Sequence, residues 1–470
     1  MGFKTYICNV FQKNNFNTFI LMANTIKIKR GLDIKIDGKA AEIVTKLPHA
    51  GIIDVIPDYF HGITPKMLVK RGETIQAGQP LFYNKNFPYM LFVAPVSGNV
   101  TAVNRGDRRK VMSVSIQADA QTEYASFPKA TSAHTREEIK ELLLQAGLWA
   151  FIKQRPYDVI ANPTHTPKAI FISTFSTAPL APDYEFVVKN QLADFQKGID
   201  ALGKLTDGKI HLGLKSQNSI FSQIKVVETT VFEGVHPAGN VGVQINKINP
   251  INKGETVWTL NVQDVIIIGR FFNKGIVDFT KFIALTGPEV AHPQYIETLA
   301  GNNVAGLTRG KLKNVNYSLR YISGNVLSGT KITENGFLSP YDDQISVIDE
   351  GSETHELFGW AMPRLDKFSA SRLFFTNLLP RKSYKFDARL LGGPRSIIMS
   401  GEYDRVFPMD IFPEFLIKAM LAKNIDKMEN LGAYEVAPED FALAEFVDSS
   451  KLPLQAIVRE ALDYMKGELE

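Results

Sequence analysis

The chain has 470 residues, which is enough for about three domains at roughly 150 residues each. Hydrophobic residues make up 44% and charged residues 22%, so the composition is globular and excludes disordered and collagen-like classes. The net charge of +4 comes without a basic block, which argues against nucleic-acid binding, and no apolar stretch approaches the about 20 residues of a membrane-spanning helix.

The N-terminal end holds the only cysteine, Cys8, which excludes disulfides, thiolate zinc sites and Cys-ligated iron–sulfur clusters within the chain. Residues 1–21 lack alternation, a helical period and a signal-peptide core, so we interpret them as an extension ahead of the fold. Apolar residues with a period of two begin at Ile26, shortly after Met22. Either Met1 or Met22 is the native start.

Residues 22–130 consist of short apolar runs separated by Gly and Pro, which predicts a small β domain. The segments GETIQAGQ (72–79) and APVSG (94–98) resemble the two hairpins of the biotinyl/lipoyl-carrier fold. In that family the modified lysine lies between these hairpins, at the position that Phe87 occupies here, and Lys85 is off register. We therefore expect a structural domain, and a carrier modified on Lys85 is the less favoured alternative.

Residues 131–258 read as an α/β domain. Thr135 and Glu138 form a capping-box pattern at the start of an apolar helix that ends at Gly147. Beyond this helix, apolar strands alternate with one further helix, which is typical of a parallel sheet. The predicted elements are strand 169–173, helix 185–202, strand 209–214 and strand 225–232.

Residues 259–350 begin with the apolar run VIIIG (265–269), which we interpret as a buried strand, and a short helix is expected near 295–299; the region fits a β-grasp-like domain. Residues 351–470 comprise a connecting segment and a helical domain. Pro413 lies in the first turn of an apolar helical stripe that we expect to pack inward, and Pro438 and Pro453 open two more helices. The stripe consists of Phe412, Phe415, Leu416, Ala419, Met420 and Met428.

Motifs for independent catalysis are absent from the sequence. Residues 203–209 have the spacing of a phosphate-binding loop, but Ile210 replaces the Ser or Thr that would hold magnesium. No G-x-G-x-x-G or G-x-S-x-G occurs, and His355-Glu356 lacks the second histidine of a zinc-protease motif. We expect no catalytic residue and no metal ligand in this chain.

Three loops rich in Gly, Pro and aromatic residues stand out, at 234–240, 359–363 and 392–395. Turn geometry is their default explanation. The alternative is contact with a quinone, whose flat ring requires aromatic or Met walls and one or two hydrogen-bond donors. The candidate quinone-binding residues are His236, Trp360, Met362 and Arg395, of which Arg395 could face an anionic semiquinone or a neighbouring carboxylate.

Several segments, in order from Ile26 to the C-terminus, resemble the A subunit of the bacterial sodium-translocating NADH:quinone reductase. They are GLW (147–149), RPY (155–157), HPAG (236–239), QDVIIIG (263–269), ISGNVLSGTK (322–331) and ELFGWAMP (356–363). The resemblance implies a mixed α/β and β multidomain fold: a lipoyl-like barrel-sandwich hybrid, a Rossmann-like α/β domain, a β-grasp (SLBB-like) domain and a C-terminal helical domain.

The same family is related to the flavin- and nucleotide-binding subunit of respiratory complex I. In that relative a Gly-rich loop holds the flavin after a helix that ends in A-G-L. Here Ala146-Gly147-Leu148 is followed by WAFIKQR (149–155), which has no glycine, so we expect its Phe and Ile side chains to fill the flavin space. The resemblance thus implies the domain architecture without the redox groups.

The functional implication is a peripheral subunit on the cytoplasmic side of the bacterial inner membrane, soluble when isolated and resting on a membrane-embedded flavoprotein subunit. Flavins and iron–sulfur centres belong to partner subunits, and this chain binds no cofactor but takes part in binding or reducing a quinone such as ubiquinone. The alternatives are a purely structural clamp without quinone binding, a lipoyl- or biotin-type carrier enzyme, and an oxidoreductase that binds flavin or NADH itself.

Overall fold

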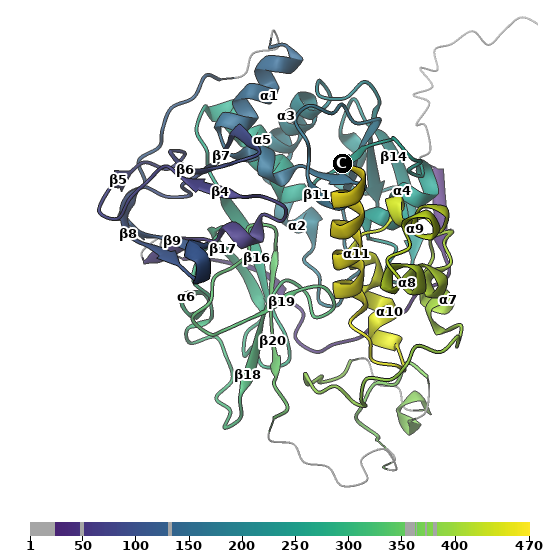
Figure 1. Cartoon of the computed structure of the whole chain (residues 1–470). Coiled ribbons are helices and arrows are strands. Elements are labelled where there is room, and N and C mark those ends of the chain that lie inside the picture. Colours follow the sequence, from purple (N-terminus) through teal and green to yellow (C-terminus); the bar gives the residue numbers. More distant parts are fainter. Residues whose placement is uncertain are drawn as a thin grey trace, which may run out of the picture.

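The computed structural model describes residues 24–47, 51–129, 134–352, 362, 364–371, 374–378 and 383–470. The β domain, the α/β domain, the β-grasp domain and the C-terminal helices lie side by side (Figure 1). The predicted fold class is confirmed. None of the helices within the described residues is both long and apolar enough to span a bilayer.

Two small sheets form the N-terminal β domain and pack around buried Leu81, Phe82 and Phe92. Gly72 and Gly78 have φ of 89° and 90°, which confirms the turns expected at these positions. The sheets consist of β3 (Ile52–Val55), β9 (Val111–Ala118), β8 (Gly98–Arg105) and β5 (Thr74–Ile75), and of β4 (Pro65–Met67), β6 (Pro80–Asn84) and β7 (Phe87–Val93).

The α/β domain is built on a seven-stranded sheet whose order is β1-β14-β13-β12-β15-β10-β11. From β1 to β15 all neighbours are parallel, and β10 runs antiparallel to β15. The strands are β1 (Asn24–Ile28), β10 (Lys153–Arg155), β11 (Val159–Ile160), β12 (Ala169–Ser173), β13 (Lys209–Leu214), β14 (Glu228–Gly234) and β15 (Val257–Thr259). The strands predicted at 169–173 and 209–214 are confirmed.

Helix α1 (Arg136–Gln145) begins with the predicted capping box between Thr135 and Glu138 and ends before Gly147, whose φ is 69°. The helix expected over 185–202 is two helices, α2 (Tyr184–Val188) and α3 (Leu192–Leu202). The chain breaks between them at Gln191, whose side-chain oxygen accepts a hydrogen bond from Arg270 at 2.8 Å.

The strand expected at VIIIG is wrong, because this run lies in helix α5 (Val262–Lys274). Every residue from Val262 to Phe272 is buried, including the polar Gln263, Asp264 and Arg270. A short apolar run such as 265–268 inside a buried helix cannot be told from a buried strand by its sequence pattern alone. Gly275 ends α5 with a φ of 72°. A further helix of the α/β domain, α4 (Val241–Ile248), connects β14 to β15.

A six-stranded sheet of order β19-β18-β20-β16-β17-β2 forms the β-grasp domain. The helix expected near 295–299 is wrong: this segment is strand β17, which pairs antiparallel with β16 and places Tyr295 and Ile296 in the buried core. The elements are β2 (Ala41–Lys46), β16 (Thr280–Thr286), β17 (Gln294–Leu299), α6 (Val304–Thr308), β18 (Leu319–Ser323), β19 (Thr330–Ile332) and β20 (Gln344–Asp349).

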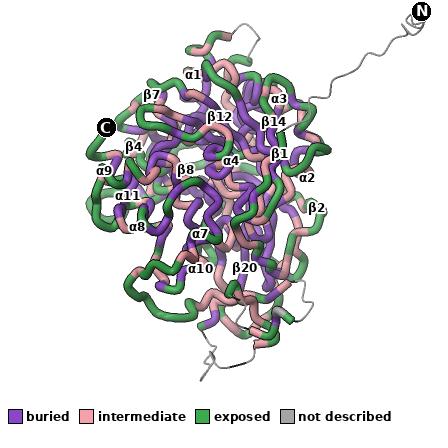
Figure 2. Tube along the Cα trace, turned by 90° about the vertical axis from the view of Figure 1, so that its right-hand side faces the viewer, coloured by how far each residue is buried: buried purple, intermediate pink, exposed green. Residues whose placement is uncertain are grey.

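The C-terminal helices pack on the α/β domain, and the buried segments form a continuous interior (Figure 2). Pro438 begins a short 3-10 helix that leads into α10, and α11 begins directly after Pro453, as predicted. The prediction that Phe412 and Phe415 pack inward is wrong, because they lie on the solvent side of α8 and are 67% and 53% exposed. The helices are α7 (Glu402–Val406), α8 (Pro413–Leu421), α9 (Ile425–Asn430), α10 (Ala442–Val447) and α11 (Leu454–Leu469).

Candidate functional site

A cavity of about 370 Å³ lies where the α/β domain, the β-grasp domain and the C-terminal helices meet. Ser173 at the end of β12 and Thr259 at the end of β15 belong to its lining. In the sheet, β12 has β13 as its neighbour on one side and β15 on the other. The chain runs from β12 to β13, and it later crosses from β14 through α4 to β15. The cavity therefore lies at the topological switch point, where open parallel sheets bind their ligands.

Two helices begin at this cavity. Asn240 precedes α4 and Asn261 precedes α5, and neither side chain caps the first turn of its helix. The backbone N–H groups of both first turns therefore retain donor capacity toward the cavity. The arrangement offers hydrogen-bond donors to a carbonyl or another acceptor group on a ligand.

His236 lines the cavity and is only 3% exposed. Its backbone N–H donates to Asp33 Oδ1 at 2.8 Å, and its ring nitrogen Nδ1 lies 3.1 Å from Thr177 Oγ1. Burial lowers the pKa of the imidazole to about 4, against a smaller raising effect of Asp33. The ring is therefore neutral at neutral pH, and Nε2 is the nitrogen that remains for a ligand.

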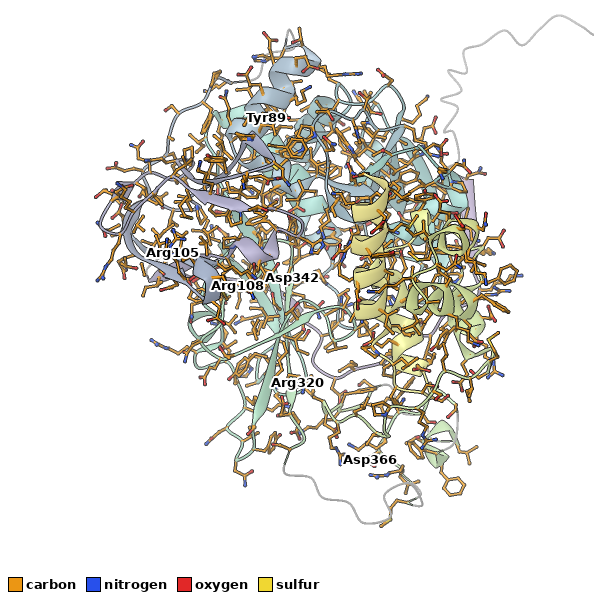
Figure 3. All side chains as sticks on the ribbon, viewed as in Figure 1. Tyr89, Arg105, Arg108, Arg320, Asp342 and Asp366 are labelled. Carbon is orange, nitrogen blue, oxygen red and sulfur yellow. The ribbon has the colours of Figure 1, made fainter. Side chains whose placement is uncertain are left out.

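Acidic side chains from two domains also line the cavity. Lys281 lies 3.0 Å from Asp264 Oδ1 and 3.1 Å from Asp343 Oδ1, so these two carboxylates share one buried cation. Asp342 accepts a hydrogen bond from Ser323 Oγ at 2.5 Å, and burial raises its pKa to about 6. Asp342 lies toward the centre of the molecule (Figure 3).

The C-terminal domain closes the cavity through an ion cluster with the α/β sheet. Arg155 on β10 donates to Asp440 Oδ2 at 2.6 Å and to Glu439 Oε1 at 3.0 Å. Burial, reinforced by the charge of Asp440, raises the pKa of Glu439 to about 7. Glu439 and Asp342 are thus two carboxyl groups that hold a proton closer to neutrality than ordinary carboxyls do.

Aromatic rings supply the apolar part of the wall. Phe151, Phe175, Tyr184 and Tyr341 all belong to the lining. The Tyr341 hydroxyl donates to the Ala150 carbonyl at 2.7 Å, which fixes the orientation of its ring. These rings give the cavity flat apolar surfaces beside the polar groups described above.

Charge decides which ligands the cavity favours. Its lining contains five carboxylate side chains and two cations, Lys153 and Arg155. The carboxylates are Asp158, Asp264, Asp342, Asp343 and Glu439. Asp264 and Asp343 share the Lys281 ammonium, and the raised pKa values of Asp342 and Glu439 reduce their charge, so the lining is weakly negative. Such a lining suits a neutral ring better than the phosphate group of a nucleotide or flavin mononucleotide.

Of the three candidate quinone-binding residues that the structure describes, His236, Met362 and Arg395, only His236 lines this cavity. Met362 is 53% exposed, and Arg395 is exposed with its backbone N–H bonded to the Ser450 carbonyl at 2.8 Å; neither belongs to the cavity lining. Trp360 lies outside the described residues.

Sequence reasoning missed the acidic wall, because its members come from α5, from the loop before β20 and from the C-terminal domain. One signal was present. The pair Asp342-Asp343 directly precedes the apolar strand β20, where carboxylates are costly unless they are paired or protonated.

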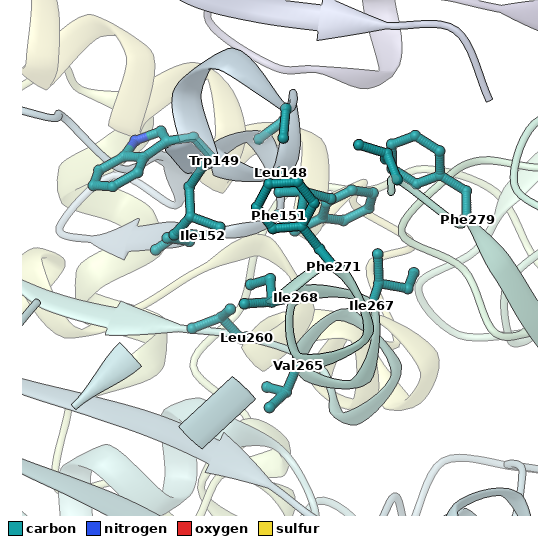
Figure 4. Packing of buried hydrophobic residues seen from close by; sticks show 14 of the residues in the cluster. Leu148, Trp149, Phe151, Ile152, Leu260, Val265, Ile267, Ile268, Phe271 and Phe279 are labelled. Atoms are coloured by element: carbon teal, nitrogen blue, oxygen red, sulfur yellow. The ribbon is translucent and has the colours of Figure 1, made fainter. Parts of the chain in front are cut away.

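The segment 148–152, which follows α1, fills the space around it with its own side chains. The buried side chains of this segment are those of Leu148, Trp149, Phe151 and Ile152. They pack against α5 and the strand ends, where Leu260, Ile268 and Phe271 lie (Figure 4). Trp149 donates its indole N–H to the Ala161 carbonyl at 2.7 Å. Its polar atom is therefore used inside the protein rather than by a ligand.

Lys85 lies with Asn86 in the two-residue turn between β6 and β7, and both residues are exposed. Phe87, which occupies the carrier position by sequence spacing, is half-buried at the start of β7. The turn is therefore the part of the β domain that a modifying enzyme could reach.

Comparison with known proteins gives matches along most of the chain. Three family profiles match: the NqrA N-terminal barrel-sandwich hybrid domain at 26–119, the NqrA second alpha/beta domain at 134–277 and the NQRA C-terminal domain at 282–334. The A subunit of the Na(+)-translocating NADH-quinone reductase of Serratia proteamaculans (strain 568) is 37% identical over 450 residues, covering 94% of this chain and 100% of the relative. Its counterpart in Neisseria meningitidis serogroup A / serotype 4A (strain DSM 15465 / Z2491) is 36% identical over 449 residues with the same coverage.

Among solved structures, the NAD+-reducing [NiFe]-hydrogenase in the H2-reduced state matches with 11% identity and a TM-score of 0.32. That match covers 64% of this chain and 55% of the hydrogenase chain.

Proposed function

The chain belongs to the family formed by the A subunits of Na(+)-translocating NADH-quinone reductases, and from this premise we propose that it binds the quinone headgroup in the assembled enzyme. As a member of this family it is one component of a multisubunit reductase. In this proposal it carries no redox centre, and electrons reach the quinone from flavins and iron–sulfur centres in partner subunits.

The observation that carries the proposal is the neutral, buried imidazole of His236 in a cavity with aromatic walls at the sheet's switch point. A quinone carbonyl oxygen is a hydrogen-bond acceptor, and a neutral imidazole can donate to it without placing a buried charge beside the ring. The phosphate of a flavin would meet the acidic wall instead. The cavity thus favours the substrate of the reductase over its cofactors.

Reduction of a quinone to a quinol consumes two electrons and two protons, so a site near the reacting ring needs proton donors. Asp342 and Glu439 line the cavity, and their pKa values are raised to about 6 and about 7. A carboxyl group with a pKa near the ambient pH can both hold and release a proton. We assign to these residues the delivery of protons to the quinone oxygens.

The absence of a flavin from this chain is part of the proposal, and packing supports it. The buried side chains of residues 148–152 fill the space that a flavin would need. The segment also contains no glycine that would let a phosphate approach the backbone. In the same proposal the chain is peripheral, on the cytoplasmic face of the bacterial inner membrane, and its main partner is the membrane-embedded flavoprotein subunit.

Equilibrium binding of a short-chain ubiquinone analogue to the isolated full-length chain tests the proposal. We expect saturable binding that His236→Ala weakens at least tenfold, about 1.4 kcal/mol, which is the loss of one buried hydrogen bond. His61→Ala is the matched control, because His61 is exposed on the surface and pairs with Asp463 at 2.8 Å. Absence of saturable binding would favour a purely structural clamp on the membrane subunit.

Two measurements on the purified chain test whether it is a carrier or a flavin enzyme. Intact mass of protein from its native host would reveal a lipoyl or biotinyl group on Lys85, which lies in the exposed turn between β6 and β7. An absorbance spectrum with flavin bands would identify an oxidoreductase that binds flavin itself. We expect an unmodified mass and a colourless protein.

A further inference from the structure

Exposed apolar side chains are concentrated in one segment of the chain. Among the described residues, thirteen large apolar side chains are more than half exposed, and eight of them lie between residues 362 and 400. This stretch, which we call the connecting segment, is a small part of the 470-residue chain. The eight residues are Met362, Leu365, Phe375, Leu378, Leu390, Leu391, Ile398 and Met399.

The connecting segment also has an inner side that is anchored to the rest of the protein. The ring of Phe368 packs against Tyr384 and Phe386 at centroid distances of 5.7 and 5.8 Å. Tyr384 donates its backbone N–H to Lys35 and accepts from Asp37, both at 3.0 Å. The segment thus has apolar residues for its own packing, and the eight outward side chains are additional to them.

Charge distinguishes this segment from the remainder of the chain. Residues 362–400 contain eight Lys or Arg and two Asp, a net charge of +6, whereas the whole chain carries +4. Some of these cations are already paired: Lys367 with Asp387 at 3.2 Å and Lys385 with Glu289 at 2.7 Å. Arg395 remains exposed beside Leu390 and Leu391 in sequence.

We propose that the connecting segment is the docking surface for a partner subunit of the reductase, whose facing surface is apolar at its centre and bears carboxylates at its rim. If each of the eight side chains exposes about 100 Å², together they offer on the order of 800 Å², the area that one partner contributes to a standard interface. This inference rests on membership of a multisubunit enzyme and is independent of where quinone binds.

A protein partner explains the segment better than an anionic membrane surface does. Membrane attachment by basic residues gains about 1 kcal/mol for each available cation, and the ion pairs of Lys367 and Lys385 reduce the number available. Leu, Ile, Met and Phe accompanied by Arg are the residue types that form the centres of protein interfaces. The lower edge of the molecule, where Asp366 is labelled in Figure 3, carries this segment.

Co-purification with the assembled reductase tests the inference. The remaining subunits are expressed with an affinity tag on one of them, together with the wild-type chain or the variant Leu390→Ser, Leu391→Ser, Ile398→Ser, Met399→Ser. All four side chains are exposed, so the fold should persist, and circular dichroism and the melting temperature verify this. We expect the amount of chain recovered with the complex to fall at least tenfold.

The control variant, Ile43→Ser with Val226→Ser, removes two apolar side chains that are 61% and 77% exposed outside the segment, and it should co-purify like the wild type. Undiminished recovery of the quadruple variant would overturn the proposal. Sedimentation of the chain with vesicles of 30% phosphatidylglycerol, lost in the same variant, would overturn it in favour of a lipid surface. Quinone binding by the isolated variant should be unchanged, which separates this test from that of the proposed function.

Discussion

The ammonium group of Lys281 lies 3.0 Å from Oδ1 of Asp264, and both side chains are fully buried. Lys281 belongs to β16 of the β-grasp sheet and Asp264 to α5 of the α/β domain, so this ion pair joins the two domains at the wall of the cavity. Burial lowers the pKa of Lys281, but Asp264 and Asp343 outweigh it and the pKa lies above its ordinary value. The lysine is charged at any pH at which the protein is folded.

Replacement of Lys281 by Met should destabilise the chain by roughly 3–5 kcal/mol, because two buried carboxylates would lose their shared cation. Denaturation in urea measures this as a lower midpoint with an unchanged slope. Lys209→Met is the control: Lys209 and Glu228 are 69% and 51% exposed, and loss of their ion pair should change stability by less than about 1 kcal/mol. Equal effects of the two replacements would contradict the role of Lys281.

Asp342 should make the chain less stable as the pH rises from about 4 to about 6. Burial raises the pKa of Asp342 to about 6 in the folded state, so in this window the folded chain holds a proton that the unfolded chain has released. Asp342→Asn cannot titrate, and it should gain up to about 3 kcal/mol on the wild type between pH 4 and pH 7. Asp119→Asn, an exposed position, should show no such gain. Urea midpoints across the pH range give the comparison, and parallel profiles for wild type and Asp342→Asn would contradict it.

His236 should have the opposite effect on the pH profile. Burial lowers its pKa to about 4, so between pH 6.5 and pH 4 the unfolded chain binds a proton that the folded chain does not. The free energy of unfolding of the wild type should therefore fall by about 3 kcal/mol more than that of His236→Gln as the pH drops through this window. The exposed His292 provides the control variant, His292→Gln, which should follow the wild type. If His236→Gln also follows the wild type, the imidazole is not excluded from water as the structure indicates.

Elements that depend on neighbouring residues could be predicted from the sequence, whereas elements that depend on tertiary packing could not. The capping box of Thr135 and Glu138 and the turns at Gly72 and Gly78 depend on neighbouring residues, and the sequence is sufficient to place them. Helix α5 was mistaken for a strand because the run 265–268 is short and entirely apolar, and such a run fits a buried strand as well as a buried helix. Strand β17 was likewise mistaken for a helix, because its strand conformation comes from pairing with β16 and β2.

The same distinction applies to the candidate site, of which one part could be predicted from the sequence and the other could not. His236 was found through its donor chemistry in a loop of Gly and Pro. The acidic residues of the lining, Asp264, Asp342 and Glu439, are distant from His236 in sequence, and only the meeting of three domains brings them to one cavity. Arg395 shared the loop signal with His236, yet its segment runs along the surface beside Ser450.

Helices α3 and α5 cross at Gly198 and Gly269, and this crossing supports the cavity wall. A Cβ on Gly269 would lie 1.7 Å from the Asp194 carbonyl oxygen, and one on Gly198 would lie 2.2 Å from the Val265 carbonyl oxygen. Gly269→Ala should therefore force the helices apart and destabilise the chain by about 1–3 kcal/mol or more in urea denaturation. Because α5 also carries Asp264, its displacement should weaken binding of the ubiquinone analogue as well.

Gly467 near the end of α11 is the matched control for Gly269, because a Cβ there meets nothing within 4 Å. Ala has the higher helix propensity, so Gly467→Ala should leave stability unchanged or raise it by up to about 1 kcal/mol, with quinone binding unaffected. The pair of variants distinguishes a close helix crossing from a general effect of glycine replacement. Wild-type stability in Gly269→Ala would show that α3 and α5 can separate without cost.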